Sequence, residues 1–253
     1  MSAPGLVLAA VDVPVENGSA LTNISQQLCL QRPDLVIATA RFGNGIDSLQ
    51  IAVDKVTKAG RRELVVVPLD LAAAAETPEP LAQACDEIRR IESDLAVCVA
   101  RPIGPAVEML MVLDQLVRAE LNRIQALEVD ALILASPAGG DARGTSLLAR
   151  RARQWSAHHR LPTQTAVMTG DGNGVALATK SLRNAGRRHI AVGTLAIEAN
   201  ELYRINKQSA LNAGAMCVTG PIPAKAFIEL ILARYAYAAM SLLRFDDEVT
   251  PSE

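Results

Sequence analysis

The amino-acid sequence predicts an α/β protein made of two tandem-duplicated modules, each a four-stranded, mainly parallel sheet flanked by helices. Half of the 253 residues are apolar, which is enough to bury a large core. Segments of the first half recur in the second half in the same order. Short, continuously apolar runs alternate with amphipathic segments, and this pattern is typical of buried parallel strands joined by helical crossovers.

The repeat is clearest in the segment AGRRELVVVPL at 59–69, which recurs as AGRRHIAVGTL at 185–195, about half a chain length later. Near the end of each half, AVCV followed by Pro-Ile at 96–103 is matched by AMCV followed by Pro-Ile at 215–222. Ordered agreement at separate places indicates duplication rather than a chance likeness of apolar strands.

Each element follows from its local pattern. A strand at about 5–10 precedes a helix with apolar residues at Leu21, Ile24 and Leu28, and a second strand begins after Pro33. The further elements expected in the first half are a helix over 47–59 ending at Gly60, a strand at 64–67, a helix near 79–92, a strand at 95–99 and a long helix after Pro105. The second half is expected to repeat this order.

A seam near 125–130 separates the two copies and lacks the Pro, Gly and Ser content of a flexible linker. We therefore expect an N-terminal module at 1–127 and a C-terminal module at 128–243. The polar, acidic tail at 244–253 is expected to be disordered.

Composition excludes several classes of function. The 25 basic and 27 acidic residues leave a formal charge of −2, and aromatic residues are only 3%, so we expect neither a nucleic-acid partner nor an anionic membrane. The first apolar run meets Asp12 before it reaches signal-peptide or membrane-span length, which predicts a cytoplasmic protein. No C-x-x-C pair occurs, and reduced, mostly buried thiols are expected at Cys29, Cys85, Cys98 and Cys217.

Open parallel sheets bind ligands beyond the carboxyl ends of their strands. Polar residues that follow the predicted strands are therefore the candidate ligand-binding residues. They are Asp12, Arg41, Asn44, Asp70 and Glu76 in the first half, and Ser136, Asp141, Asp171 and Glu201 in the second half.

The three histidines lie away from these strand ends. His158 and His159 fall at a polar helix end, and His189 precedes a strand. No H-x-x-x-H or C-x-x-C spacing marks a preformed metal site. A solvated or structural role is therefore predicted for each histidine.

Two glycine-rich loops partly match nucleotide-binding motifs. The loop at 139–144 has the glycine spacing of a phosphate loop, but Thr145 stands where the lysine is required. A plain turn is favoured, with anion binding at the following helix start as the alternative. The loop at 170–174 lacks the G-x-G-x-x-G spacing and is interpreted as a strand-to-helix turn, like the similar segment at 42–45.

The accumulated pattern resembles the sirohydrochlorin ferrochelatase and cobaltochelatase family, the class II tetrapyrrole chelatases, in its two-copy form. The likeness rests on segments 35–42, 59–69 and 102–105 and extends over about 5–235. The resemblance implies two chelatase-like modules facing across a central cleft. It also implies a tetrapyrrole ligand, with Fe²⁺ or Co²⁺ as substrate, and a place in siroheme or cobalamin biosynthesis.

The sequence departs from this family at the catalytic histidines. Family members carry a histidine just after the first strand, in a His-Gly-Ser-Arg type motif, where this chain has AAVDVP at 9–14 and ASPAG at 135–139. Counting on from Pro68 to a further family histidine reaches Glu76, and the equivalent count in the second copy reaches Leu202. The resemblance therefore extends to the scaffold and not to the known metal site.

Two functions follow from different classes. In the first, the protein is a metal-inserting lyase in which Glu76 receives the metal and Glu76 and Asp70 are the catalytic carboxylates that take pyrrole protons. In the second, it is a catalytically silent member that binds a tetrapyrrole, another small ligand or a protein partner. A homo-oligomer is compatible with both functions, and a nucleotide-dependent enzyme is less well supported because neither glycine loop meets its motif.

Overall fold

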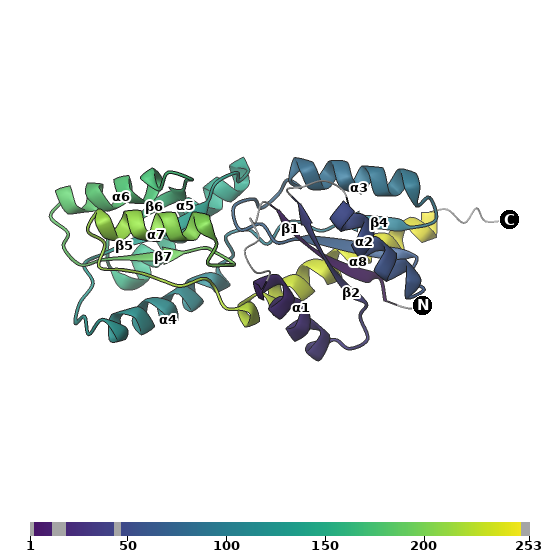
Figure 1. The fold of residues 1–253 in the computed structure, drawn as a ribbon, viewed down its shortest axis with the longest axis horizontal. Helices are drawn as coiled ribbons and strands as arrows, with labels where there is room; N and C mark the ends of the chain where they lie inside the picture. Colours follow the sequence, from purple (N-terminus) through teal and green to yellow (C-terminus); the bar gives the residue numbers. More distant parts are fainter. Residues whose placement is uncertain (1–2, 12–18, 43–46, 249–253) are drawn as a thin grey trace. The chain divides into compact units, whose positions relative to one another are not determined.

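The computed structural model describes residues 3–11, 19–42 and 47–248, which form two compact α/β units (Figure 1). The first unit consists of Met1–Asp70, Ala75–Ile103 and Ala224–Glu253. The second unit consists of Leu71–Ala74 and Gly104–Pro223. Each unit contains one sheet of four parallel strands, so the predicted fold class is confirmed.

The first unit has the strand order β2-β1-β3-β4. Its strands are β1 (Gly5–Val11), β2 (Ile37–Phe42), β3 (Glu63–Pro68) and β4 (Ala96–Val99). Its helices are α1 (Ser19–Gln31), α2 (Asp47–Lys58), α3 (Glu79–Ile91) and α8 (Ile228–Glu248), the last preceded by the 3₁₀ turn η1 (Ala224–Ala226).

The second unit has the equivalent order β6-β5-β7-β8. Its strands are β5 (Ala131–Pro137), β6 (Thr163–Met168), β7 (Ile190–Thr194) and β8 (Cys217–Val218). Its helices are α4 (Glu108–Arg123), α5 (Ala142–His159), α6 (Asn173–Asn184) and α7 (Glu201–Asn212).

The registers of the two sheets agree as a duplication requires. Leu6 lies opposite Val65 in the first sheet, and Leu132 lies opposite Ala191 in the second. Val65 and Ala191 occupy equivalent positions in the repeated segments 59–69 and 185–195. The internal repeat is thus visible as two sheets of the same order and pairing.

The compact units do not follow the halves 1–127 and 128–243 that the repeat suggested. Helix α4 follows β4 in the chain but packs against β7 and β8 of the second unit. Helix α8 follows the second sheet but packs against β3 and β4 of the first. The last helix of each sequence copy therefore completes the other copy's sheet.

Each sheet is buried on both faces. In the first unit, Val7 and Ala9 of β1 pack in one cluster with Val53 of α2 and Leu81 of α3. The intervening β1 residues Leu6 and Leu8 are fully buried as well but lie outside that cluster. Because successive strand residues point to opposite faces, Leu6 and Leu8 face the side covered by α1 and α8. Both faces of β1 are therefore buried, and its sequence is apolar without alternation.

In the second unit, α6 and α7 cover one face and α4 covers the other, as Figure 1 shows. The cluster beneath α6 and α7 contains Ile133, Val192, Val175 and Tyr203. Gly193, which alternates with Val192 along β7, approaches Trp155 of α5 and Leu113 of α4. The helices α4 and α5 therefore share the second face.

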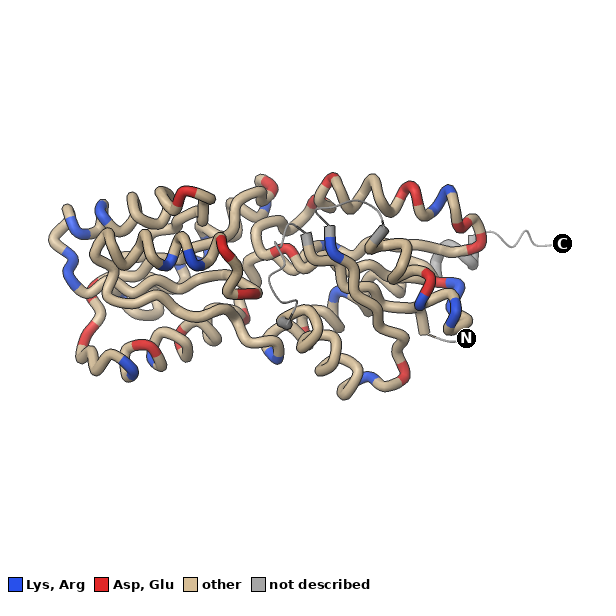
Figure 2. Tube along the Cα trace, in the orientation of Figure 1, with Lys and Arg blue, Asp and Glu red and all other residues tan. Residues whose placement is uncertain are grey.

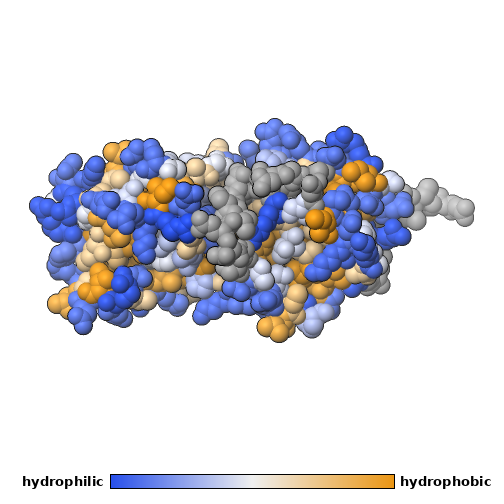
Figure 3. All heavy atoms as spheres, in the orientation of Figure 1, coloured by the Kyte–Doolittle hydropathy of each residue, from blue (hydrophilic) through white to orange (hydrophobic). Residues whose placement is uncertain are grey.

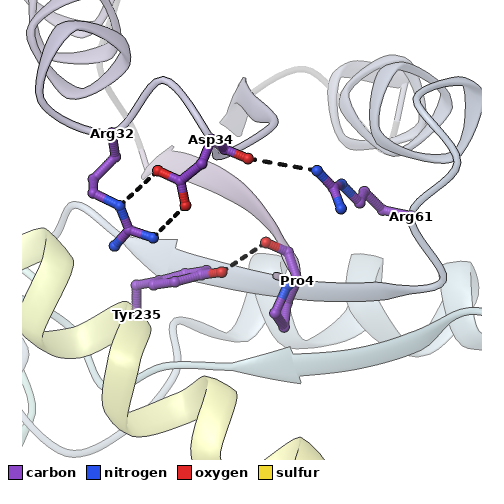
Figure 4. Close-up of polar contacts among 5 residues, drawn as sticks. All are labelled: Pro4, Arg32, Asp34, Arg61 and Tyr235. Atoms are coloured by element: carbon purple, nitrogen blue, oxygen red, sulfur yellow. Dashed lines mark hydrogen bonds and ion pairs between the residues drawn. The ribbon is translucent and has the colours of Figure 1, made fainter. Parts of the chain in front are cut away.

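Helix α8 is fixed to the first unit by polar contacts as well as apolar ones. The hydroxyl of Tyr235 donates a hydrogen bond to the Pro4 carbonyl at 2.7 Å. Beside it, Arg32 forms two hydrogen bonds with the Asp34 carboxylate, at 2.8 and 2.6 Å, and Arg61 Nη2 donates to the Asp34 carbonyl at 3.4 Å (Figure 4).

Helix α8 also extends to Glu248. Residues 244–248 are therefore helical, where the sequence analysis expected disorder, because the chain continues a helix whose inner face packs on the first sheet. The remainder of that tail, 249–253, lies outside the described residues.

The surface is of mixed character. Figure 2 shows Lys and Arg interspersed with Asp and Glu along the helices of both units, and Figure 3 shows apolar residues scattered among polar ones on one face. Among the described helices, none has both the length and the apolar character needed to cross a membrane.

Candidate functional site

The carboxyl ends of the first unit's strands meet at one edge. Ala9 of β1 lies opposite both Ala40 of β2 and Pro68 of β3, and the Leu69 N–H donates to the Ala9 carbonyl at 2.7 Å. Arg41, near the end of β2, and Asp70, two residues after β3, therefore lie at the same end of the sheet, on the two strands that flank β1. Their placement at this edge agrees with the sequence prediction.

Arg41 is the most informative of these residues. Its backbone N–H donates to Ser48 Oγ at 2.7 Å, and the residue is half-buried. Its Nη1 nitrogen is buried and has no hydrogen-bond partner among the described residues. Burying a charged donor without a partner is costly, and such groups indicate a missing ligand, ion or water. This end of β2 is therefore suited to an anion.

The two candidate catalytic carboxylates come from the segment after β3. Asp70 is half-buried, and Glu76 is exposed. Two further candidates, Asp12 and Asn44, lie outside the described residues.

In the second unit, Asp141 has a structural role. Its Oδ1 accepts a hydrogen bond from the Gly144 N–H at 2.5 Å and caps α5, and its Oδ2 accepts one from the Ala74 N–H at 3.1 Å. Both carboxylate oxygens thus bind backbone donors. Ser136 is 2% exposed, and its hydroxyl contacts the Pro137 carbonyl at 3.3 Å.

The glycine-rich loop at 139–144 is explained by close packing. A Cβ atom on Gly144 would lie 1.8 Å from the Ala72 carbonyl oxygen, and one on Gly140 would lie 2.5 Å from it. The two glycines therefore admit the segment Leu71–Ala74 against the start of α5. Within the described residues, this packing accounts for the glycines without a bound phosphate and agrees with the plain turn that the sequence favoured.

Asp171 organises the turn from β6 to α6. Its carboxylate accepts hydrogen bonds from Thr169 Oγ1 at 2.6 Å and from Asn173 N and Nδ2 at 3.0 and 2.6 Å. These bonds, with that from Thr169 the largest cause, hold the pKa of Asp171 below its ordinary value. Gly172 has φ +71° there, a conformation that glycine adopts readily. The turn predicted at 170–174 is thus present.

Glu201 lies in the first turn of α7, after Asn200, whose side chain accepts from the Tyr203 N–H at 2.9 Å. A carboxylate there interacts favourably with the helix dipole. Tyr203 also belongs to a buried polar network just after β8, in which its Oη donates to the Thr219 carbonyl at 2.9 Å. Glu201 itself is exposed.

The architecture is similar to that of known chelatases. No family model matches the chain, and no curated protein matches it. Two four-stranded parallel sheets of equivalent order, flanked by helices, are the fold of the chelatases, and solved structures establish this likeness.

The chain is similar to the sirohydrochlorin chelatase SirB from Bacillus subtilis subspecies spizizenii in complex with cobalt, with a TM-score of 0.69 and 11% identity, over 93% of this chain and 96% of that one. It is also similar to CbiX, described as the terminal enzyme of siroheme biosynthesis in denitrifying bacteria, with a TM-score of 0.59 and 16% identity, over 90% and 98% of the two chains. A multi-domain protein of Deinococcus radiodurans with structural similarity to chelatases matches with a TM-score of 0.60 and 14% identity, over 92% of this chain and 54% of that one.

Proposed function

We propose that the protein binds a tetrapyrrole of the sirohydrochlorin type. The chelatase-like fold supports this proposal. The observation on which it depends is the buried Nη1 of Arg41, for which the described residues offer no hydrogen-bond partner. Sirohydrochlorin bears carboxylates around its ring, and an arginine at a strand end can bind such a carboxylate through charge-assisted hydrogen bonds. The ligand would satisfy the donor that the described residues leave unpaired.

The test is a titration of the purified protein with sirohydrochlorin, followed by visible absorption. Replacement of Arg41 by Met removes the charge and is expected to weaken binding roughly 10- to 100-fold, because a hydrogen bond to a charged group contributes about 1.5–3 kcal/mol. The matched control is Arg61→Met, because the buried Nε of Arg61 also has no hydrogen-bond partner among the described residues, but Arg61 precedes β3 at the opposite end of the same sheet. Absence of a spectral shift in the wild type, or equal effects of both variants, would contradict the proposal.

A second candidate function is metal insertion with Fe²⁺ or Co²⁺ as substrate. It is supported by Asp70, which follows β3 at the sheet end that also holds Arg41. Glu76 follows in the same connection, before α3. As a divalent ion enters the ring, two pyrrole N–H protons must leave, and a carboxylate is a suitable acceptor. In this function Glu76 receives the metal ion and, with Asp70, accepts the protons.

The rate of metallation separates the two candidates. Protein is mixed with sirohydrochlorin and then with ferrous or cobaltous ion, and the rate is compared with that of the free ligand. Faster metallation that is lost in Glu76→Ala but kept in Glu79→Ala, an exposed glutamate in the first turn of α3, supports the enzyme. A ligand-induced spectral shift without faster metallation supports a catalytically silent binding protein.

A further inference from the structure

A cluster of metal-ligating side chains lies in the second unit, away from the strand ends. Asp114 projects from α4 toward the last turn of α5, which carries His158 and His159. The Nε2 atom of His159 lies 2.7 Å from Asp114 Oδ1, and the Nε2 atom of His158 lies 3.9 Å from Asp114 Oδ2. One ligand atom from each residue lies within 4.8 Å of the other two.

These separations suit a single metal ion. Zinc binds imidazole nitrogen and carboxylate oxygen at about 2.0–2.2 Å, so ligand atoms around one ion lie about 3 Å apart. The observed distances of 2.7 and 3.9 Å lie on either side of that value. The His158 side chain is 68% exposed and can approach the carboxylate by a small rotation about its side-chain bonds.

The Asp114 carboxylate is held in position by a hydrogen bond from a buried side chain. Its side chain is 15% exposed, and its Oδ1 accepts a hydrogen bond at 2.5 Å from Nε1 of Trp155, which is almost fully buried. Hydrogen bonds of this kind orient carboxylate ligands in metal sites.

A purely structural hydrogen bond between helices explains only part of this cluster. It accounts for Trp155 and His159, which tie α5 to α4 through Asp114. It does not involve His158, which is exposed, forms an ion pair with the same carboxylate, and lies edge-on to His159 with ring centroids 4.7 Å apart. Two neighbouring imidazoles beside one carboxylate make a ligand set that a transition-metal ion can use.

Two cavities adjoin the cluster. A cavity of about 560 Å³ is lined by Asp114, Trp155 and His158 together with Leu110 and Met111. A smaller cavity of about 230 Å³ is lined by Asp114, Trp155 and His159. Three protein ligands beside an open cavity are typical of sites that keep a coordination position for water or a small molecule, whereas structural sites are closed by a fourth protein ligand.

We propose that Asp114, His158 and His159 bind one divalent transition-metal ion, of the class of Zn²⁺, Co²⁺ or Ni²⁺. Two imidazoles and one carboxylate favour these ions over Mg²⁺ and Ca²⁺, which prefer oxygen ligands alone. The site is independent of the proposed tetrapyrrole binding, because its three ligands all belong to α4 and α5 and none lies at a strand end.

The experiment uses the full, untagged chain after treatment with a chelator. Cobaltous ion is titrated while the fluorescence of Trp155, the single tryptophan, and the visible absorption of the bound ion are followed. Saturable binding of one ion per chain with quenched fluorescence is expected, and magnesium should produce neither signal. Zinc should bind competitively in calorimetry.

Variants test the three ligands separately. His158→Ala, His159→Ala and Asp114→Asn should each weaken cobalt binding by at least about tenfold. Asn at 114 keeps an oxygen that can accept the Trp155 hydrogen bond, and His158 is largely exposed, so these two variants should remain folded. The matched control is His189→Ala, which removes the remaining histidine, placed 2.8 Å from Glu128, and should bind as the wild type does.

Absence of saturable cobalt binding in the wild type would overturn the proposal, as would a His189→Ala variant that loses as much affinity as His158→Ala. Arg41→Met should leave cobalt binding unchanged. Failure of tetrapyrrole binding and failure of this metal site are therefore distinguishable.

Discussion

The hydroxyl of Tyr235 donates a hydrogen bond to the carbonyl of Pro4 at 2.7 Å, which joins the last helix of the chain to the residue before its first strand. Tyr235 is only 5% exposed and Pro4 is half-buried, so the bond is partly shielded from water. It holds α8 on the sheet that the first sequence copy forms. The exchange of last helices between the two copies thus has a specific polar contact as well as apolar packing.

The change Tyr235→Phe should destabilise the first unit by about 0.5–1.5 kcal/mol, because the half-buried Pro4 carbonyl would lose its hydrogen-bond donor. Urea unfolding measures the free-energy difference. The control is Tyr237→Phe on the same helix, where the side chain is 70% exposed and little change is expected. Equal losses in both variants would show that the hydrogen bond is not the cause.

The same tyrosine predicts a loss of stability at alkaline pH. Burial is the main cause that raises the pKa of Tyr235 to about 12, with smaller contributions from Arg32, which lowers it, and Asp34, which raises it. The folded state therefore holds this proton more tightly than the unfolded state, whose tyrosine pKa is about 10. The resulting stability is complete below pH 10 and is lost as the pH rises from about 10 to about 12.

Comparison of the wild type with Tyr235→Phe isolates this contribution, since the other titrating groups are common to both proteins. The difference in unfolding free energy between them should shrink across that pH range. A difference that stays constant would mean that Tyr235 does not ionise on unfolding.

Much of the fold could be predicted because it depends on local patterns. The run Leu64–Val67 is apolar at every position, as expected of a strand that is covered on both faces. Gly60 follows the end of α2 with φ +76°, as a glycine at a helix C-terminus often does. The exchange of α4 and α8 could not be predicted in this way. An apolar stripe on a helix shows that the helix packs on a sheet but does not specify which of two similar sheets receives it.

The close approach of two backbone segments predicts a severe effect of Gly144→Ala. The new methyl group would lie 1.8 Å from the Ala72 carbonyl oxygen, so either α5 or the segment Leu71–Ala74 must move. A loss of about 1–3 kcal/mol or more is expected from such overpacking, measured by thermal unfolding.

The control for this substitution is Gly170→Ala, because a Cβ atom there would meet nothing within 4 Å. If Gly144→Ala is as stable as the control, the glycine is not required for packing, and anion binding at the start of α5 becomes the better explanation.

The four cysteines should differ in reactivity toward thiol reagents. Burial raises the pKa of Cys85 and of Cys217 to about 11, and the reactive form is the thiolate. Cys29 is exposed and should react first, Cys98 more slowly, and the two buried thiols only on unfolding. Labelling with and without urea measures this order. Cys29→Ser should remove the fast phase, and rapid labelling of Cys85 or Cys217 in the folded protein would contradict the prediction.

The candidate sites show a different limit of sequence reasoning. Topology places Arg41 and Asp70 at the same end of the sheet, since parallel strands end together, and their binding and catalytic roles stay predictions. Sequence could not show that Asp141 and Asp171 form backbone hydrogen bonds in a cap and a turn, because a short polar side chain suits either use. Nor could it bring Asp114 to His158, since the two lie on different helices with no fixed spacing. The adjacent histidine pair was the one available signal.

Packing beneath Trp155 gives a final prediction. A Cβ atom on Gly193 of β7 would lie 2.6 Å from Cη2 of the indole and 3.5 Å from Leu113 Cδ1. Gly193→Ala must therefore displace the indole, whose N–H group orients Asp114. The tryptophan emission should shift to longer wavelength, and stability should fall by about 1–3 kcal/mol.

The matched control is Gly220→Ala, where a Cβ atom would meet nothing within 4 Å. If Asp114 is held for metal binding by the indole, Gly193→Ala should also weaken cobalt binding, although it changes none of the three ligands. Displaced tryptophan emission with unchanged cobalt affinity would show that Trp155 serves packing alone, because the carboxylate would then keep its position without the indole hydrogen bond.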